Sequence, residues 1–182
     1  MKKNTKLILY GAVSAASGVI SYAVYKALYG GDARFMIKAA SSGMMEIDLG
    51  HAAKRNAVSQ DVKDFGARMT EDHKHFESEL RTIGEKKKIK LTENLLPKHR
   101  RILDRLLALS GADFDREYMY SMVIDHIKYI SSFKKALDKI KDPDLKAWAN
   151  RTLPVLQQHL KTAKEIAPRV GVDLTRAEKE AA

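Results

Sequence analysis

The chain has 182 residues, a formal net charge of +10 and no cysteine. Its length fits one domain with short appendages, and its 45% hydrophobic content is that of a globular protein. Without cysteine the chain forms no disulfide, no cysteine-based zinc site and no iron–sulfur cluster. Any bound metal must therefore be held by histidine and carboxylate side chains.

Residues 1–29 contain four lysines, no acidic residue and an uncharged run from Leu7 to Tyr25. As a helix this run would span about 28 Å, close to the hydrocarbon thickness of a bilayer. Lysines before the run and tyrosines at its C-terminal end and just beyond favour a retained single-pass anchor in the inner membrane. The N-terminus would then be cytoplasmic and the rest of the chain periplasmic. A cleaved signal peptide, with small residues at 14–16, is the alternative.

Beyond the anchor, apolar residues recur at three- and four-residue steps in four long stretches. No strand-like alternation of useful length occurs. Asp142-Pro143 is a typical N-cap and first-turn pair for the last stretch, and Pro154 predicts a kink or a local break inside it. The four predicted helices run over about 33–56, 59–87, 112–140 and 143–166.

The connection between the second and third helices is long, and residues 97–109 predict a short extra helix within it. Two short-linked helix pairs joined by one long connection form the topology of ferritin-like bundles. The sequence therefore predicts an all-α, ferritin-like four-helix bundle over residues 30–170. A simple up-down-up-down bundle is the alternative, and residues 171–182 are expected to form a polar tail.

Each apolar stripe is interrupted near its middle by a residue that can bind metal or protons. These residues are Glu46, His73, His126 and His159, each about 13 to 16 residues into its predicted helix. Mid-helix positions lie at one height in an antiparallel bundle, whatever the direction of each helix. The sequence therefore predicts that the four side chains meet at one point, where a divalent transition metal such as iron or zinc could bind.

A short repeat adds two carboxylates to this set. Residues 69–73 and 122–126 share the pattern Met-x-x-Asp-His, which places Asp72 and Asp125 beside two of the histidines. Adjacent residues on a helix do not face each other, so each Asp would orient an imidazole on a neighbouring helix.

A hydrogen-bonded polar network without metal is the competing interpretation, and the commoner arrangement for such residues. A diiron carboxylate centre is disfavoured because the sequence has no Glu-x-x-His motif. The other three histidines, His51, His75 and His99, are expected on the surface.

Four segments together resemble the bacterial family of unknown function DUF4142. They read FMIKAASSGMMEIDLGHAA, VKDFGARMTEDHKHFESEL, LSGADFDREYMYSMVIDHIKYI and DPDLKAWANRTLPVLQQHL, and the resemblance covers residues 34–167. It implies an exported, helical, ferritin-like protein, of a kind often labelled an outer-membrane protein. The resemblance also implies a family pattern at Glu46, Asp72, His73, Phe114, Asp115, Tyr118, Asp125, His126, Leu153, Pro154 and His159.

The remaining positive charge is concentrated in the long connection, at residues 86–90 and 98–101. No nucleic-acid motif or aromatic interleaving accompanies it, so a solvated basic surface is favoured over nucleic-acid binding. The predicted function is metal handling or stress protection in the envelope by an anchored bundle. The alternative is a scaffold subunit that contacts a membrane protein or forms a homo-oligomer. No nucleophile–base pair or cofactor motif occurs, which favours a non-enzymatic role.

Overall fold

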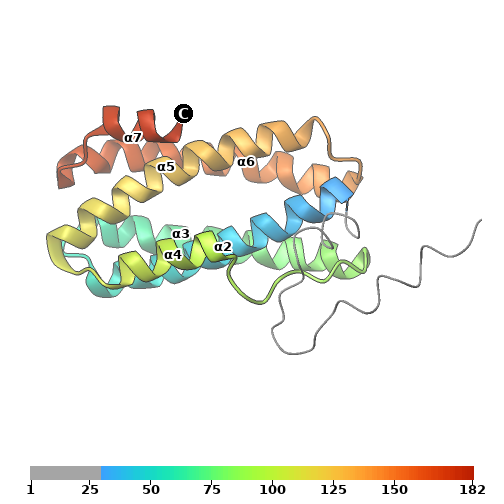
Figure 1. Cartoon of the computed structure of the whole chain (residues 1–182), viewed down its shortest axis with the longest axis horizontal. Coiled ribbons are helices and arrows are strands. Elements are labelled where there is room, and N and C mark those ends of the chain that lie inside the picture. The colour runs from blue at the N-terminus through green and yellow to red at the C-terminus, as the bar shows by residue number, and fades with distance from the viewer. Residues whose placement is uncertain (1–29) are drawn as a thin grey trace, which may run out of the picture.

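In residues 30–182, four long helices carry the fold, with three shorter ones packed around them (Figure 1). The computed structural model describes residues 30–182, and the predicted anchor lies outside the described residues. No strand occurs in residues 30–182, and the four predicted long helices are confirmed, as is the short helix in the long connection. The elements are α2 (Gly30–Asn56), α3 (Gln60–Lys86), α4 (Pro97–Leu107), α5 (Gly111–Leu137), α6 (Pro143–Ile166), η2 (Ala167–Val170) and α7 (Leu174–Ala181).

The loops at the two ends of the bundle fix the direction of each helix. At one end, the Asp32 carboxylate at the start of α2 accepts hydrogen bonds from the backbone N–H groups of Lys141 and Asp142, at 3.2 and 3.0 Å. At the other end, Asp115 near the start of α5 accepts from the N–H groups of Val58 and Ser59, between α2 and α3. Helices α2 and α6 therefore run one way, and α3 and α5 run the other way.

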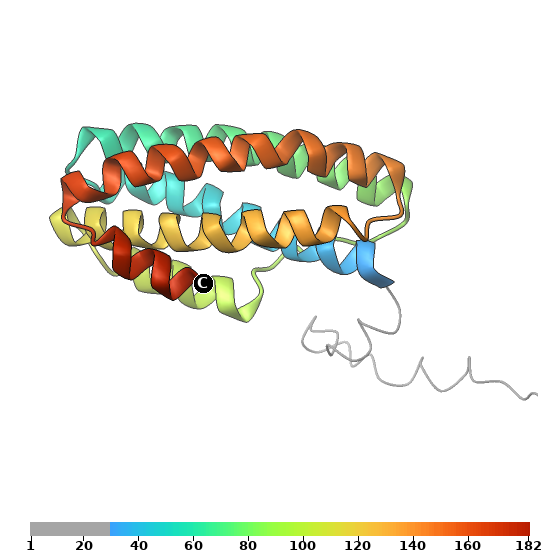
Figure 2. The same cartoon turned by 90° about the horizontal axis from the view of Figure 1, so that it is seen from above.

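Because α3 and α5 are parallel, the chain must cross the length of the bundle between them. Residues 87–110 make this crossover, and α4 lies within it (Figures 1 and 2). The two antiparallel hairpins, α2–α3 and α5–α6, are thus joined by one long connection. This order excludes the up-down-up-down alternative. Helix α6 continues through Pro154, so the predicted local break does not form there.

The apolar core is divided into two clusters along the bundle axis. Met45, Met69 and Met122 belong to the cluster near the α2–α3 turn. Leu80 and Trp148 belong to the cluster at the opposite end, near the α5–α6 turn. On each of α3, α5 and α6, one buried histidine lies between the residues of one cluster and those of the other. These are His73, His126 and His159. A polar layer therefore lies across the middle of the core.

The C-terminal residues, expected to be a polar tail, fold back onto the bundle. Gly171, with φ of 82°, ends the short helix η2 in the left-handed conformation that glycine adopts most readily. Helix α7 then packs against α5, where Ala177 is fully buried and Glu180 accepts a hydrogen bond from the Tyr120 hydroxyl at 2.6 Å. In the sequence, this helix is indicated by Asp173, an N-cap residue, followed by a short helical pattern.

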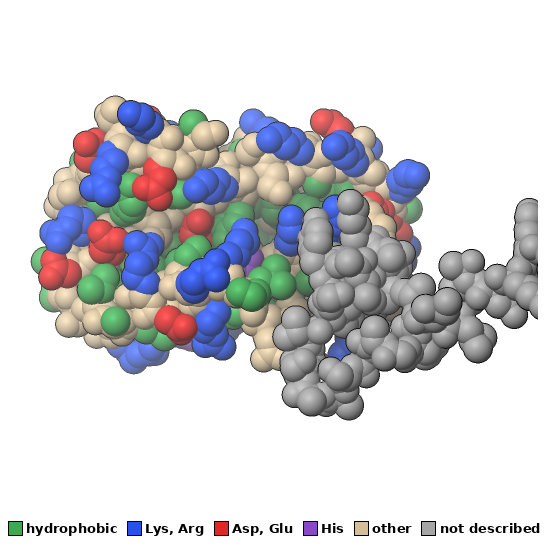
Figure 3. All heavy atoms as spheres, in the orientation of Figure 1, with side chains coloured by type: hydrophobic (Ala, Val, Ile, Leu, Met, Phe, Trp, Pro, Cys, Tyr) green, Lys and Arg blue, Asp and Glu red, His purple; other side chains and the backbone are tan. Residues whose placement is uncertain are grey.

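On the face shown in Figure 3, Lys and Arg side chains alternate with acidic ones. The cations at residues 86–90 and 98–101, including Lys86, Lys88, Lys90 and Arg101, are exposed, as expected of a solvated basic surface. Across residues 30–182, no helix is both long enough and apolar enough to cross a membrane.

Candidate metal site

Three histidines from three helices converge in the polar layer. His73 comes from α3, His126 from α5 and His159 from α6, and each offers one ring nitrogen within 4.8 Å of the other two. Their side chains are 5%, 0% and 1% exposed, so the cluster is closed to bulk water. The rings are separated by 5.5 to 6.4 Å between centroids.

Two of these imidazoles are oriented by partners on their outer nitrogens. His159 donates Nε2–H to Asp72 at 2.7 Å, and His126 donates Nδ1–H to the backbone carbonyl of Met122 at 2.9 Å. A carboxylate and a carbonyl can only accept here, so the bonds fix the tautomers of both rings. The lone pairs then lie on Nδ1 of His159 and on Nε2 of His126. Metal-binding histidines are typically held by such partners.

The inner nitrogens have no hydrogen-bond partner among the described residues. These atoms are Nε2 of His73, Nε2 of His126 and Nδ1 of His159, and all three are buried. An unpartnered buried polar atom costs on the order of 1–3 kcal/mol, so three at one point require an explanation. Metal coordination would give all three nitrogens a partner at once.

The spacing of the nitrogens fits a metal after a small adjustment. A tetrahedral centre with bonds of about 2.0–2.1 Å would place two nitrogens roughly 3.3 Å apart. The present separations, all within 4.8 Å, would have to shrink by up to about 1.5 Å.

Burial also keeps these imidazoles neutral, the form that binds metal. Desolvation, followed by the charge of the nearby His159, lowers the pKa of His126 to about 3, and the hydrogen bond to the Met122 carbonyl only partly opposes this. The pKa of His73 is lowered by burial and by the other two histidines. For His159, burial lowers the pKa while the hydrogen bond to Asp72 opposes that effect.

Glu46 on α2 is fully buried, and neither carboxylate oxygen has a partner among the described residues. Burial raises the pKa of Glu46 well above its usual range, and the charge of Asp125 raises it further. Its ligand atoms are not within the group that the three histidines form. Glu46 does share a face of α2 with Gly43. A Cβ added to Gly43 would lie 3.9 Å from Nδ1 of His73.

The two aspartates of the Met-x-x-Asp-His repeat lie in different surroundings. Asp72 reaches across from α3 to α6 and orients His159, as expected of an Asp beside a His. Asp125 makes no hydrogen bond to a histidine in the described part of the chain, and its charged neighbours include Lys128, Lys98 and Arg105. Burial raises the pKa of Asp125 to about 6. The repeat in sequence is therefore not a repeat in structure.

His51 and His75 are exposed, but the prediction that His99 lies on the surface is wrong. Helix α4 packs against α2, which leaves His99 only 1% exposed, with Nδ1 2.7 Å from the hydroxyl oxygen of Ser41. His99, Leu103 and Leu106 share one face of α4, and this spacing was the signal for burial. Burial, followed by the charge of Lys98, lowers the pKa of His99 to about 4.

The buried His99 is expected to make the fold sensitive to acid. The unfolded chain binds a proton near pH 6.5, whereas the folded chain binds it only near pH 4. The stability is therefore complete above pH 6.5 and falls as the pH drops towards 4. Between pH 7 and pH 5, His99 should account for about 2 kcal/mol of the loss. Urea unfolding of wild type and His99→Gln at both pH values measures this contribution; parallel losses in the two proteins would contradict it.

A family comparison gives the chain its place among known proteins. The family model of a domain of unknown function, DUF4142, matches residues 21–166. The chain belongs to the DUF4142 family. The match takes in the four long helices and all three clustered histidines of this DUF4142 domain. Neither the curated proteins nor the solved structures give a match.

Proposed function

We propose that the protein binds one divalent transition metal ion, such as zinc or iron, in the core of a ferritin-like bundle. The ligands are Nε2 of His73, Nε2 of His126 and Nδ1 of His159. One observation carries the proposal: three buried nitrogens converge without partners, while the outer nitrogens of two rings are already held. An all-imidazole set suits zinc, iron, copper and nickel.

Glu46 is proposed as a further carboxylate for the same ion. Its oxygens are buried and unpartnered, and it follows Gly43 by one turn on the face of α2 that lies towards His73. A carboxylate would offset the charge that a divalent ion brings into a buried site of neutral imidazoles. Asp72 is proposed to orient the ligand His159 through their hydrogen bond. Asp125 is proposed to add negative charge near Glu46.

The cellular role that fits this site is metal handling or stress protection in the envelope. The uncharged run at Leu7–Tyr25 and the flanking lysines support a single-pass inner-membrane anchor with the bundle in the periplasm. The single long crossover between α3 and α5 supports the ferritin-like topology.

Calorimetric titration of the metal-free full chain with zinc tests the proposal. We expect one zinc per chain, and a loss of affinity of more than about 100-fold in His126→Ala, because a direct ligand is removed. Asp72→Asn should weaken binding by roughly 10- to 100-fold, since it leaves the ligands but loosens the hold on His159. His75→Ala is the matched control, an exposed histidine two residues from His73, and should bind as wild type does.

A titration in which wild type takes up no zinc, iron or other divalent metal would contradict the proposal. So would equal affinity in wild type and His126→Ala, because the ion would then bind elsewhere. Either result would favour a metal-free polar network in the core.

A further inference from the structure

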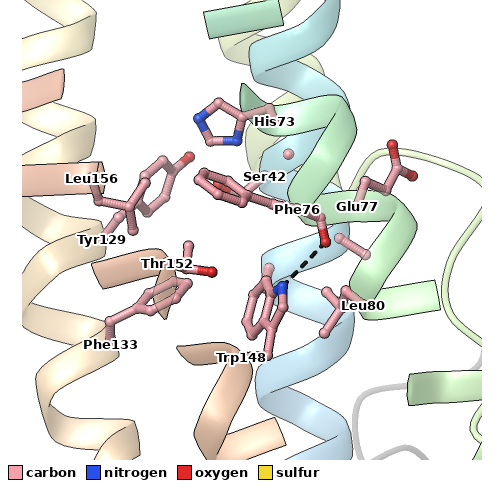
Figure 4. A pocket seen from close by; sticks show the side chains of 13 residues that line it. Ser42, His73, Phe76, Glu77, Leu80, Tyr129, Phe133, Trp148, Thr152 and Leu156 are labelled. Atoms are coloured by element: carbon pink, nitrogen blue, oxygen red, sulfur yellow. Dashed lines mark hydrogen bonds between the residues drawn. The ribbon is translucent and has the colours of Figure 1, made fainter. Parts of the chain in front are cut away.

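A small pocket adjoins the outer side of His73. It has a volume of about 30 Å³, which is room for about two water molecules. Its walls are mainly apolar, with Phe76, Phe133, Trp148 and Leu156 around it (Figure 4). The pocket belongs to the apolar cluster at the α5–α6 end, but a few polar groups interrupt its lining.

One polar group of this pocket, the Thr152 hydroxyl, is free to bind a ligand. The Thr152 hydroxyl is buried, with the residue 2% exposed, and has no hydrogen-bond partner among the described residues. In Figure 4 its oxygen points into the space between the Phe76 ring and Trp148, further from His73 than the Phe76 ring is in this view. The Tyr129 and Ser42 hydroxyls line the same pocket. The Trp148 indole is not available, because its N–H donates to the Phe76 carbonyl at 3.3 Å.

His73 differs from the other two histidines in its outer nitrogen. Asp72 holds the outer nitrogen of His159, and the Met122 carbonyl holds that of His126. No group in the described part of the chain is hydrogen-bonded to Nδ1 of His73. This nitrogen lies beside the pocket, 3.9 Å from where a Cβ on the pocket residue Gly43 would be. With a metal on Nε2, Nδ1 carries the proton and must donate.

We infer that this pocket binds a small hydrogen-bond acceptor, of the size of water or a three-atom anion, between Nδ1–H of His73 and the Thr152 hydroxyl. The inference rests on the proposed function, because a metal on Nε2 fixes the proton on Nδ1. The apolar walls exclude larger hydrated solutes, and the positive charge of the ion favours an anion over a cation. The bound acceptor gives the outer nitrogen of His73 a hydrogen-bond partner, so that all three histidines have one. It also places an exchangeable molecule beside a ring that binds the metal.

Azide is a suitable probe, since it has three atoms, only accepts hydrogen bonds and gives an infrared band that responds to its surroundings. The zinc-loaded full chain is titrated with azide, by calorimetry and by infrared absorption. Thr152→Val removes the hydroxyl at nearly constant shape. Gly43→Ala places a methyl group in ordinary contact with Nδ1 of His73 and narrows the pocket. Thr82→Val, an exposed threonine on α3, is the matched control.

We expect wild type and Thr82→Val to bind azide equally, and the two pocket variants to bind it roughly 5- to 10-fold more weakly, with zinc affinity unchanged. If water is the only occupant, the zinc-loaded wild type binds no azide, and the anion part of the inference is overturned. Equal azide affinity in all four proteins places the anion elsewhere and overturns the whole inference. Failure of wild type to bind zinc overturns the proposed function instead, so the two failures are distinguishable.

Discussion

Saturating zinc is expected to raise the free energy of unfolding of the full chain by about 3 kcal/mol. A ligand that binds only the folded state stabilises it by about 2.7 kcal/mol at 100 times its dissociation constant. The three nitrogens converge only when α3, α5 and α6 are packed together, so the unfolded chain offers no comparable site. Urea unfolding in detergent, with zinc and with a chelator, measures the difference.

In the same assay His126→Ala should show no zinc-dependent gain, because the remaining nitrogens cannot surround an ion. His75→Ala should retain the full gain, since that histidine is exposed and its ion-pair partner among residues 30–182 is Glu79, at 3.9 Å. Equal unfolding of wild type in zinc and in chelator would refute a metal site in the core.

Gly50→Ala is expected to destabilise the bundle by roughly 3 kcal/mol. Helices α2 and α3 approach so closely at this point that a Cβ on Gly50 would clash with the Gly66 carbonyl oxygen. The obstacle is backbone, so the helices themselves would have to separate. The gain in helix propensity from Gly to Ala, about 1 kcal/mol, offsets only part of this cost.

Gly43→Ala is the matched control on the same helix. Its Cβ would meet only Nδ1 of His73, at 3.9 Å, which is ordinary contact, so this variant should be as stable as wild type or slightly more stable. Urea unfolding of the three proteins in chelator separates the effects. Similar stability of Gly50→Ala and Gly43→Ala would show that the α2–α3 contact is not as close as described.

The sequence predicts the fold well because its helices are long and strongly periodic. The mid-helix positions of His73, His126 and His159 also predict their common height, since the helices are of similar length and begin near the bundle ends. What the sequence does not contain is the rotation of each helix about its own axis. That rotation turns Asp72 towards His159, yet leaves Asp125 among cations beside α4, although both follow the same pattern.

His99 and helix α7 depend on contacts made at long range. His99 stands between basic residues, and its burial requires α4 to pack against Ser41 on α2, 58 residues earlier in the chain. Helix α7 is short and polar, and the α5 surface that covers Ala177 is formed by a distant part of the sequence. Local patterns indicate both helices, but the partner surface decides which side chains are buried.

The most direct test of the metal site is a crystal structure of the zinc-loaded chain, with anomalous diffraction data collected at the zinc edge. We expect one anomalous peak within about 2.1 Å of Nε2 of His73, Nε2 of His126 and Nδ1 of His159. Asp72 and the Met122 carbonyl should keep their bonds to the outer nitrogens. A peak bound through the opposite ring nitrogens, a peak at the surface, or no peak in the core would contradict this expectation.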